Sequence, residues 1–277
     1  MPTTDQHGDA PRHGAALPHS LELTAVGGPT LAVRLGTVRL LVDPTFDPPG
    51  SYESGAGSGR FLHKTAGPAL APEKLGRVDA VLLSHDQHVD NLDGSGRAVA
   101  LAAPVVLTTP EAATRLGPPA RGLEPWEEVD VRGANGATVR ATAVPARHGP
   151  AGTEHLTGPV TGFVLTGPGL PTVYVSGDNA SMDAVRSVAE RFPRVDVAVV
   201  FAGGAKSALI GDVFLTFDSA RAAEAAAVLG AEVVVPVHFE GWAHFTEGAE
   251  ALRAAFAAAT LDRRLHILVP GRRTVLG

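Results

Sequence analysis

The fold prediction starts from one stretch of the sequence, VLLSHDQHVDNLD, which spans residues 81–93. Its leading aliphatic residues are typical of a short buried strand, and the loop behind them holds two histidines and three aspartates. Buried carboxylates and imidazoles need a paired charge or a cation, and no lysine or arginine lies within this loop. The stretch therefore indicates a metal site at the end of a strand.

Three further aliphatic runs end in a histidine or an aspartate in the same way. Because functional groups gather at the carboxyl ends of strands, these side chains are expected to meet. A lone histidine after a strand is more often structural, and Asp178 alone would serve as the N-cap of a helix that starts at Ser181. The clusters together nevertheless favour a metal site. The runs and their polar ends are residues 139–144 with His148, residues 172–176 with Asp178, and residues 232–237 with His238.

The remaining pattern predicts two sheets with helices outside them. Alternating β-branched runs, broken by glycines, predict antiparallel strands at residues 21–26, 30–35 and 38–42. Near-continuous apolar runs predict strands covered on both faces at residues 81–84, 105–108, 139–144, 161–165, 172–176, 195–201, 232–237 and 265–269. Helical periodicity is found at residues 110–116, 181–192, 218–229 and 246–258. This order fits an α/β fold, a four-layer α/β/β/α sandwich.

The domain prediction rests on where the chain changes composition. Residues 1–19 are rich in Pro, Gly and polar residues, which predicts a flexible N-terminal tail. No linker interrupts the rest, so residues 20–277 are expected to form a single domain. The loop at residues 47–59, rich in Pro, Gly and Ser, either caps a site or is loosely ordered.

Composition excludes several classes of function. The 277 residues carry a net charge of −6, which argues against nucleic acid or an anionic membrane as the main partner. There is no cysteine, so disulfides, thiolate zinc sites and cysteine nucleophiles are excluded. No apolar run approaches the roughly 20 residues of a membrane span, and no signal-peptide core is found. We expect a cytoplasmic protein with a small-molecule substrate, either monomeric or a homo-oligomer.

The residues SHDQHVDN at 84–91, His148, SGD at 176–178 and His238 resemble the ordered ligand series of the metallo-β-lactamase superfamily. In that superfamily a His-x-His-x-Asp-His loop, a later His, a bridging Asp and a final His hold one or two metals between two sheets. The loop after Asp43-Pro44 and the ending at 238–242 most resemble the branch that contains L-ascorbate-6-phosphate lactonase. The resemblance covers residue 21 to the C-terminus and implies the metallo-β-lactamase fold.

The first loop departs from the family pattern, and two alignments stay open. If His85 takes the first position without a gap, Gln87 replaces the second His and Val89 replaces the Asp. If His88 and Asp90 are aligned instead, Asn91 replaces the last His and Asp86 falls at the first position. A bulge of one residue after Ser84 would let His85, His88 and Asp90 all face the metals. Gln and Asn are weak ligands, so a full dinuclear centre is not implied by every alignment.

The chemistry expected of the site follows from its ligand types. Imidazoles with carboxylates suit Zn(II), one or two ions, with Mn(II) or Fe(II) as competitors. Metal-bound hydroxide would then attack a lactone, ester or phosphodiester, and Asp178 would bridge two metals. Asp90 either binds a metal or accepts a proton, and His244 either supports a ligand or donates a proton to the leaving group. Trp242 is expected in the pocket wall, and Lys206 is a candidate phosphate contact. The expected metal ligands are His85, His88, Asp90, His148, Asp178 and His238.

The alternative comes from a different class of protein. A non-catalytic or regulatory member of the fold would have lost tight metal binding through the altered first loop. The three intact downstream ligand positions, His148, Asp178 and His238, favour the enzyme. A metal assay on the purified protein discriminates between these two hypotheses.

Overall fold

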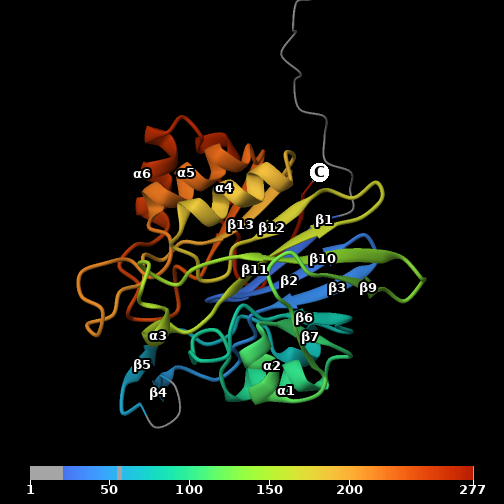
Figure 1. Ribbon diagram of the computed structural model, residues 1–277, viewed down its shortest axis with the longest axis horizontal. Helices are drawn as coiled ribbons and strands as arrows, with labels where there is room; N and C mark the ends of the chain where they lie inside the picture. Colours follow the sequence, from blue (N-terminus) through green and yellow to red (C-terminus); the bar gives the residue numbers. More distant parts are fainter. Residues whose placement is uncertain (1–20, 55–57, 277) are drawn as a thin grey trace, which may run out of the picture.

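Two β-sheets packed face to face form the centre of the computed structural model, which describes residues 21–54 and 58–276. Helices cover the outer face of each sheet, so the layers follow the order helix, sheet, sheet, helix (Figure 1). This is the predicted four-layer sandwich. The tail predicted at residues 1–19 lies outside the described part of the chain, and a single domain over residues 20–277 stays a prediction.

The first sheet has seven strands in the order β15-β1-β2-β3-β6-β7-β8. Strands β1 to β3 and β15 pair antiparallel, whereas β3, β6, β7 and β8 run parallel. The strands are β1 (Leu21–Gly27), β2 (Thr30–Leu35), β3 (Val38–Val42), β6 (Ala80–Leu82), β7 (Val106–Thr108), β8 (Ala120–Gly122) and β15 (Arg273–Leu276).

The second sheet has six strands in the order β14-β13-β12-β11-β10-β9, with β12, β13 and β14 parallel. A separate two-stranded hairpin consists of β4 (Gly50–Glu53) and β5 (Phe61–Lys64). The strands of the second sheet are β9 (Glu128–Arg132), β10 (Thr138–Pro145), β11 (Thr161–Thr166), β12 (Val173–Val175), β13 (Val197–Phe201) and β14 (Val233–Val237).

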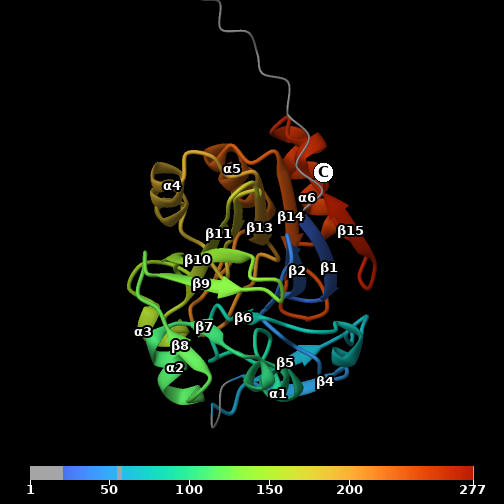
Figure 2. The same ribbon diagram turned by 90° about the vertical axis from the view of Figure 1, so that its right-hand side faces the viewer.

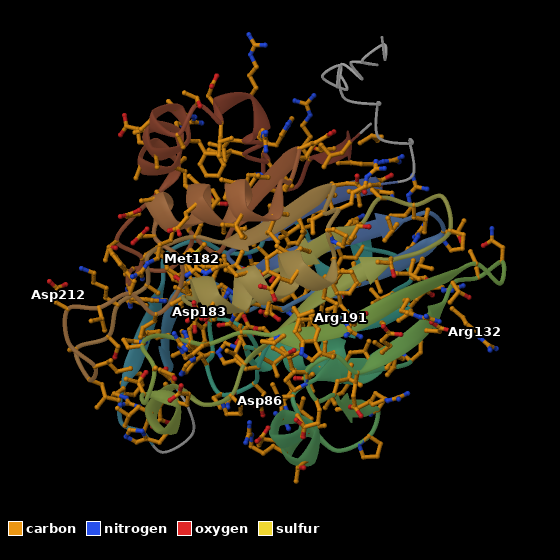
Figure 3. The ribbon with its side chains drawn as sticks, turned by 45° about the horizontal axis from the view of Figure 1, so that its top comes forward. Asp86, Arg132, Met182, Asp183, Arg191 and Asp212 are labelled. Atoms are coloured by element: carbon orange, nitrogen blue, oxygen red, sulfur yellow. The ribbon has the colours of Figure 1, made fainter. Side chains whose placement is uncertain are left out.

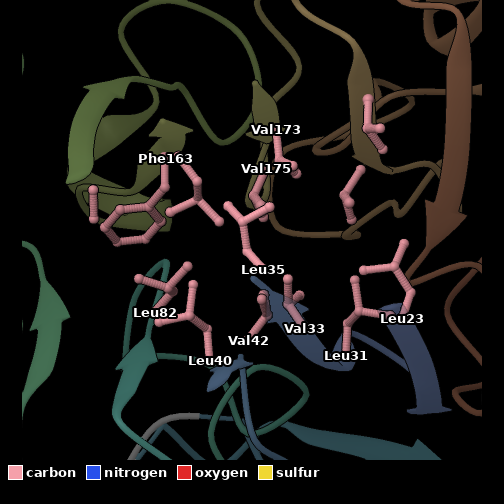
Figure 4. Packing of buried hydrophobic residues seen from close by; sticks show 14 of the residues in the cluster. Leu23, Leu31, Val33, Leu35, Leu40, Val42, Leu82, Phe163, Val173 and Val175 are labelled. Atoms are coloured by element: carbon pink, nitrogen blue, oxygen red, sulfur yellow. The ribbon is translucent and has the colours of Figure 1, made fainter. Parts of the chain in front are cut away.

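Alternation of side chains along the strands builds the core between the sheets. In β2, Leu31, Val33 and Leu35 are buried and point to the second sheet, while the residues between them are partly exposed. Val33 lies opposite Leu23 on one side and Leu40 on the other, so the apolar side chains form continuous rows across strands. Figure 4 shows these residues facing Phe163, Val173 and Val175 of the second sheet.

Apart from the short α3, the α-helices fall into two groups on opposite outer faces (Figure 2). The first group packs on β6 and β7, and the second packs on the central strands of the second sheet. Ser181 accepts a hydrogen bond from the Ala184 amide and therefore caps α4, which removes the N-cap function considered for Asp178. The helices are α1 (Gly94–Ala102), α2 (Pro110–Leu116), a short α3 (Glu154–Thr157), α4 (Met182–Arg191), α5 (Ser219–Leu229), α6 (Ala249–Ala258), and the 3₁₀ turns Pro72–Lys74 and Asp262–Arg264.

The prediction of a strand at residues 265–269 is wrong. Only Leu265 forms a bridge, to Val234, and the chain then leaves the second sheet and returns to the first as β15 beside β1. After the His266 amide donates a hydrogen bond to the Val234 carbonyl, the segment forms no further bridge to β14, so no ladder extends it as a strand. Among the described residues, no helix is long and apolar enough to cross a membrane.

Candidate metal centre

Four strands deliver the predicted ligands to one end of the sandwich. His85 follows β6 of the first sheet, whereas His148, Asp178 and His238 follow β10, β12 and β14 of the second. The two sheets are joined at this end by a hydrogen bond of 3.1 Å from the Thr161 amide to the Ser84 carbonyl. The candidate site therefore lies between the sheets rather than on either one.

Gly177 allows the Asp178 loop to approach the first sheet. Its φ of +58° is in the left-handed region, which favours glycine. A Cβ at this position would lie 2.6 Å from the Thr161 carbonyl oxygen and 2.8 Å from the Ser84 Cβ. Because no side chain fits there, the backbone of one sheet contacts the other directly, and Asp178 is brought beside His85.

The first group of possible ligands consists of His85, His88, His148 and Asp178. His88 Nδ1 lies 2.9 Å from His85 Nε2 and 3.2 Å from His148 Nε2, and His148 Nε2 lies 3.5 Å from Asp178 Oδ2. Burial lowers the pKa of His85 well below its usual range and that of His88 to about 4. Both imidazoles are therefore neutral at physiological pH, which is the form that binds metal ions.

The second group consists of Asp90, Asp178 and His238. His238 Nδ1 lies 3.0 Å from Asp178 Oδ1, and its Nε2 lies 3.2 Å from Asp90 Oδ2. Neither ring nitrogen of His238 has an aligned hydrogen-bond partner, and Asp90 Oδ1 has none either, although all three atoms are buried. Close polar atoms that do not point at one another are expected where each points at a shared cation, so the residues present fit a metal.

Asp178 belongs to both groups and lies between them. Its Oδ2 faces the first group and its Oδ1 faces His238. Burial disfavours the ionised carboxyl, but His238 and His148 hold the pKa of Asp178 below its usual range. An ionised carboxylate with one oxygen toward each group has the arrangement needed to bridge two cations.

A cavity of about 380 Å³ opens onto these residues. Its lining includes His88, Asp90, His148, Asp178 and His244. His244 Nε2 lies 3.1 Å from Asp90 Oδ2, so these two side chains form a polar pair inside the cavity. The structure thus brings together all the predicted ligands and His244, and that they bind a metal stays a prediction.

Residues 38–239, most of the chain, match the family model described as a beta-lactamase superfamily domain. The chain belongs to the metallo-β-lactamase superfamily. Two relatives named UPF0173 metal-dependent hydrolase are each 32% identical to it. The relative from Methanosphaerula palustris aligns over 70% of this chain and 82% of its own length, and that from Anaeromyxobacter sp. strain K over 76% and 74%.

Two solved structures share the metallo-β-lactamase fold of this chain. A possible metal-dependent hydrolase from Veillonella parvula has a TM-score of 0.78 at 17% identity, covering 95% of this chain and 100% of its own. Isothiocyanate hydrolase from Delia radicum gut bacteria has a TM-score of 0.75 at 21% identity, covering 91% and 98%. The fold prediction is confirmed, and the relatives at 32% identity are named metal-dependent hydrolases.

Asp43, a buried carboxylate that was not among the predicted site residues, contacts residues beside the candidate metal ligands. Asp43, directly after β3, accepts hydrogen bonds from the Ser84 amide at 2.7 Å, the Ser84 hydroxyl at 2.6 Å and Asn91 Nδ2 at 3.0 Å. The Ser84 hydroxyl lies 2.9 Å from His85 Nδ1, and Asn91 Nδ2 donates to Asp178 at 3.1 Å. Asp43 thus orients Ser84 beside His85 and Asn91 beside Asp178. Its position at a strand end was the signal that could have revealed it.

Two of the three aspartates in the first loop lie outside the metal centre. Asp86 pairs with Arg115, and the Asp93 carboxylate lies 2.9 Å from Lys64 Nζ. The expectation that these carboxylates need a cation because no basic residue lies within the loop is therefore wrong for both. Their basic partners come from other parts of the chain, and only Asp90 joins the metal groups.

Trp242 lies outside the pocket wall in which it was expected, whereas Lys206 lies in the cavity. Trp242 is not among the residues that line the cavity, and its ring packs against Lys64, with Nζ 5.4 Å from the ring centre. Lys206 does line the cavity, but its ammonium group pairs with Asp212 and lies over the Phe214 ring. A phosphate contact from Lys206 stays a prediction.

Gln87→His is expected to leave metal stoichiometry unchanged. The first ligand group already contains His88, and the Gln87 side chain packs so closely against Gly158 that a Cβ there would lie 2.2 Å from Gln87 Nε2. The geometry follows the bulged alignment, in which His88 takes the inward position. Elemental analysis of the variant and the parent protein checks this. A rise in metal content would instead support the ungapped alignment.

Proposed function

We propose that this protein hydrolyses an ester, lactone or phosphodiester bond of a small molecule with the help of one or two divalent cations, zinc first among them. The observation that carries the proposal is the position of Asp178, between two buried ligand groups that open onto a cavity of about 380 Å³. That volume lies in the range typical of small-molecule sites.

The donor set supports zinc. One cation would be held by His85, His88 and His148, the other by Asp90 and His238, and Asp178 would be shared. Imidazole-rich sites with carboxylates suit Zn(II), and Mn(II) and Fe(II) are the competitors. A divalent cation in such a site supplies a Lewis acid that activates water and polarises the bond to be cleaved.

Asp90 and His244 are proposed to move the protons. Hydrolysis requires one proton to leave the attacking water and one to reach the leaving oxygen. Asp90 Oδ2 would accept the first, and His244 Nε2, 3.1 Å away and inside the cavity, would deliver the second. Asp90 Oδ1, which has no hydrogen-bond partner in the described structure, stays available as a ligand. The alternative of a non-catalytic protein assumed that the first loop had lost a ligand at Gln87. His88 supplies an imidazole to the first ligand group in its place, so this alternative loses support.

Replacing His85, His148 or His238 with Ala is expected to lower bound zinc and to remove hydrolysis of test esters, with little change in the far-ultraviolet circular dichroism spectrum. Each substitution deletes a buried ligand at the end of a different strand. Bound metal is measured by elemental analysis after dialysis of the zinc-loaded protein. His266→Ala, outside both ligand groups, is the matched control. Full metal content in all three variants would refute the assignment.

Zinc binding is expected to release a proton at neutral pH. Burial disfavours a charge on His238, but Asp178 and Asp90 raise its pKa to about 10 in the metal-free protein. A cation must displace this proton to reach the ring, so its apparent affinity rises with pH, by about tenfold per pH unit for one proton. Calorimetric titrations in two buffers of different ionisation enthalpy measure the release. An affinity independent of pH would contradict this expectation.

A further inference from the structure

Exposed large apolar side chains are concentrated at the mouth of the cavity of about 380 Å³ that contains predicted ligands. In residues 21–54 and 58–276, such side chains are Phe61, Leu156, Leu209, Val269 and Val275. Phe61, Leu156 and Leu209 are 64%, 39% and 47% exposed, and all three line the cavity that contains His88 and Asp90. Apolar side chains gathered around one opening indicate a surface that binds an apolar group.

Three separate segments contribute these side chains. Phe61 begins β5 of the hairpin, Leu156 lies in α3, and Leu209 lies in the loop between β13 and α5. The hairpin, α3 and this loop lie at the same end of the sandwich in Figure 1. Further inside, Leu62, Ile210 and Leu215 continue the lining. The cavity therefore has a polar floor of predicted ligands and apolar walls.

Cationic groups in the cavity are few. Arg60 and Lys206 are its basic lining residues apart from the histidines. Lys206 is paired with Asp212, which lies at the outer end of the loop between β13 and α5 (Figure 3). Arg60 is an exposed residue of the β4–β5 hairpin. A phosphate dianion needs several convergent donors, and the walls do not provide them.

We propose that the substrate is a small ester or lactone whose alkyl or aryl group binds between Phe61, Leu156 and Leu209. This inference rests on the proposed function and narrows it, because a sugar phosphate or a phosphodiester would place charge against apolar walls. In the reaction, water adds across the acyl C–O bond, the hydroxyl joining the acyl carbon and the proton joining the leaving oxygen. The acyl carbon faces the floor of predicted ligands, and the apolar group faces the mouth.

Binding of hexanoate and acetate to the zinc-loaded, full-length protein tests the walls without requiring turnover. Each methylene that the cavity buries should tighten binding by about fourfold. Hexanoate is therefore expected to bind up to about 200-fold more tightly than acetate in calorimetric titrations. Phe61→Ser and Leu209→Ser should each reduce this gain several-fold and leave acetate binding unchanged. Val269→Ser and Val275→Ser, exposed but outside the cavity, are the matched controls and should keep the full gain.

Equal affinity for hexanoate and acetate, or an undiminished gain in both wall variants, would overturn the inference. Hydrolysis of nitrophenyl acetate and nitrophenyl hexanoate by the same protein separates this inference from the proposed function. Turnover of both esters with equal kcat/KM would leave the proposed function standing and contradict the apolar site. Hexanoate binding that depends on chain length, without turnover of any ester, would support the apolar site and contradict the proposed function.

Discussion

Asp178→Asn is expected to reduce turnover by about 100-fold or more while the fold is retained. Asparagine keeps the size of the side chain but loses the charge, so it cannot hold two cations through two anionic oxygens. The second group should lose more of its bound metal than the first, because its only other possible ligands are Asp90 and His238. Metal content by elemental analysis and kcat for a responsive ester give the two measurements.

Asp86→Asn is the matched control for this prediction. Asp86 lies in the same loop as the ligands, but its carboxylate pairs with Arg115 outside the site. We expect its metal content and turnover to stay close to those of the parent. Unaltered metal and activity in Asp178→Asn would remove Asp178 from the site, and an N-cap function would not explain its burial because Ser181 already caps α4.

Lys64→Met is expected to lower the free energy of unfolding by about 3 kcal/mol. Lys64 Nζ lies 2.9 Å from Asp93 Oδ2, and both side chains are almost fully buried. The Asp93 carboxylate also accepts hydrogen bonds from the backbone amides of Phe46, Asp47 and Gly96, so it cannot turn toward water. Loss of the ammonium group leaves this charge buried without a counter-ion. Urea denaturation of the metal-free proteins measures the change.

Two further variants make the stability prediction specific. Arg140→Met removes the partner of Asp130 in a half-exposed pair, where the expected loss of stability is small because solvent screens the two charges. Adding Asp93→Asn to Lys64→Met removes the uncompensated charge and should restore part of the stability. If Lys64→Met costs no more than Arg140→Met, the buried pair contributes little to stability.

The four strand ends that carry predicted ligands could be recognised from the sequence, because an aliphatic run and the polar residue that follows it are local features. His85, His148, Asp178 and His238 each follow such a run, and the structure brings all of them to one place. The partners of the other two aspartates of the first loop, Asp86 and Asp93, could not be predicted. Arg115 and Lys64, which pair with Asp86 and Asp93, lie far from the loop in sequence, and their contacts depend on the folded chain.

The missed and wrong elements have similar causes. Helix α1 contains two glycines, which lower helix propensity, and it forms because Asp93 caps it and its Ala100 packs against the first sheet. Strand β15 is short and gains its order from pairing with β1. The apolar residues at 265–269 satisfied a strand pattern, but no strand of the second sheet continues there. Tertiary contacts override local preference in each case.

The position of the predicted ligands between two sheets has a mechanical consequence. His85, His88 and Asp90 belong to the first sheet's loop, whereas His148, Asp178 and His238 follow strands of the second. A cation held by both sets would be a cross-link across the sandwich, in a chain that has no cysteine with which to form a disulfide. Chelation would remove that cross-link, and the ligand end of the sandwich would then be the first part to open to a protease.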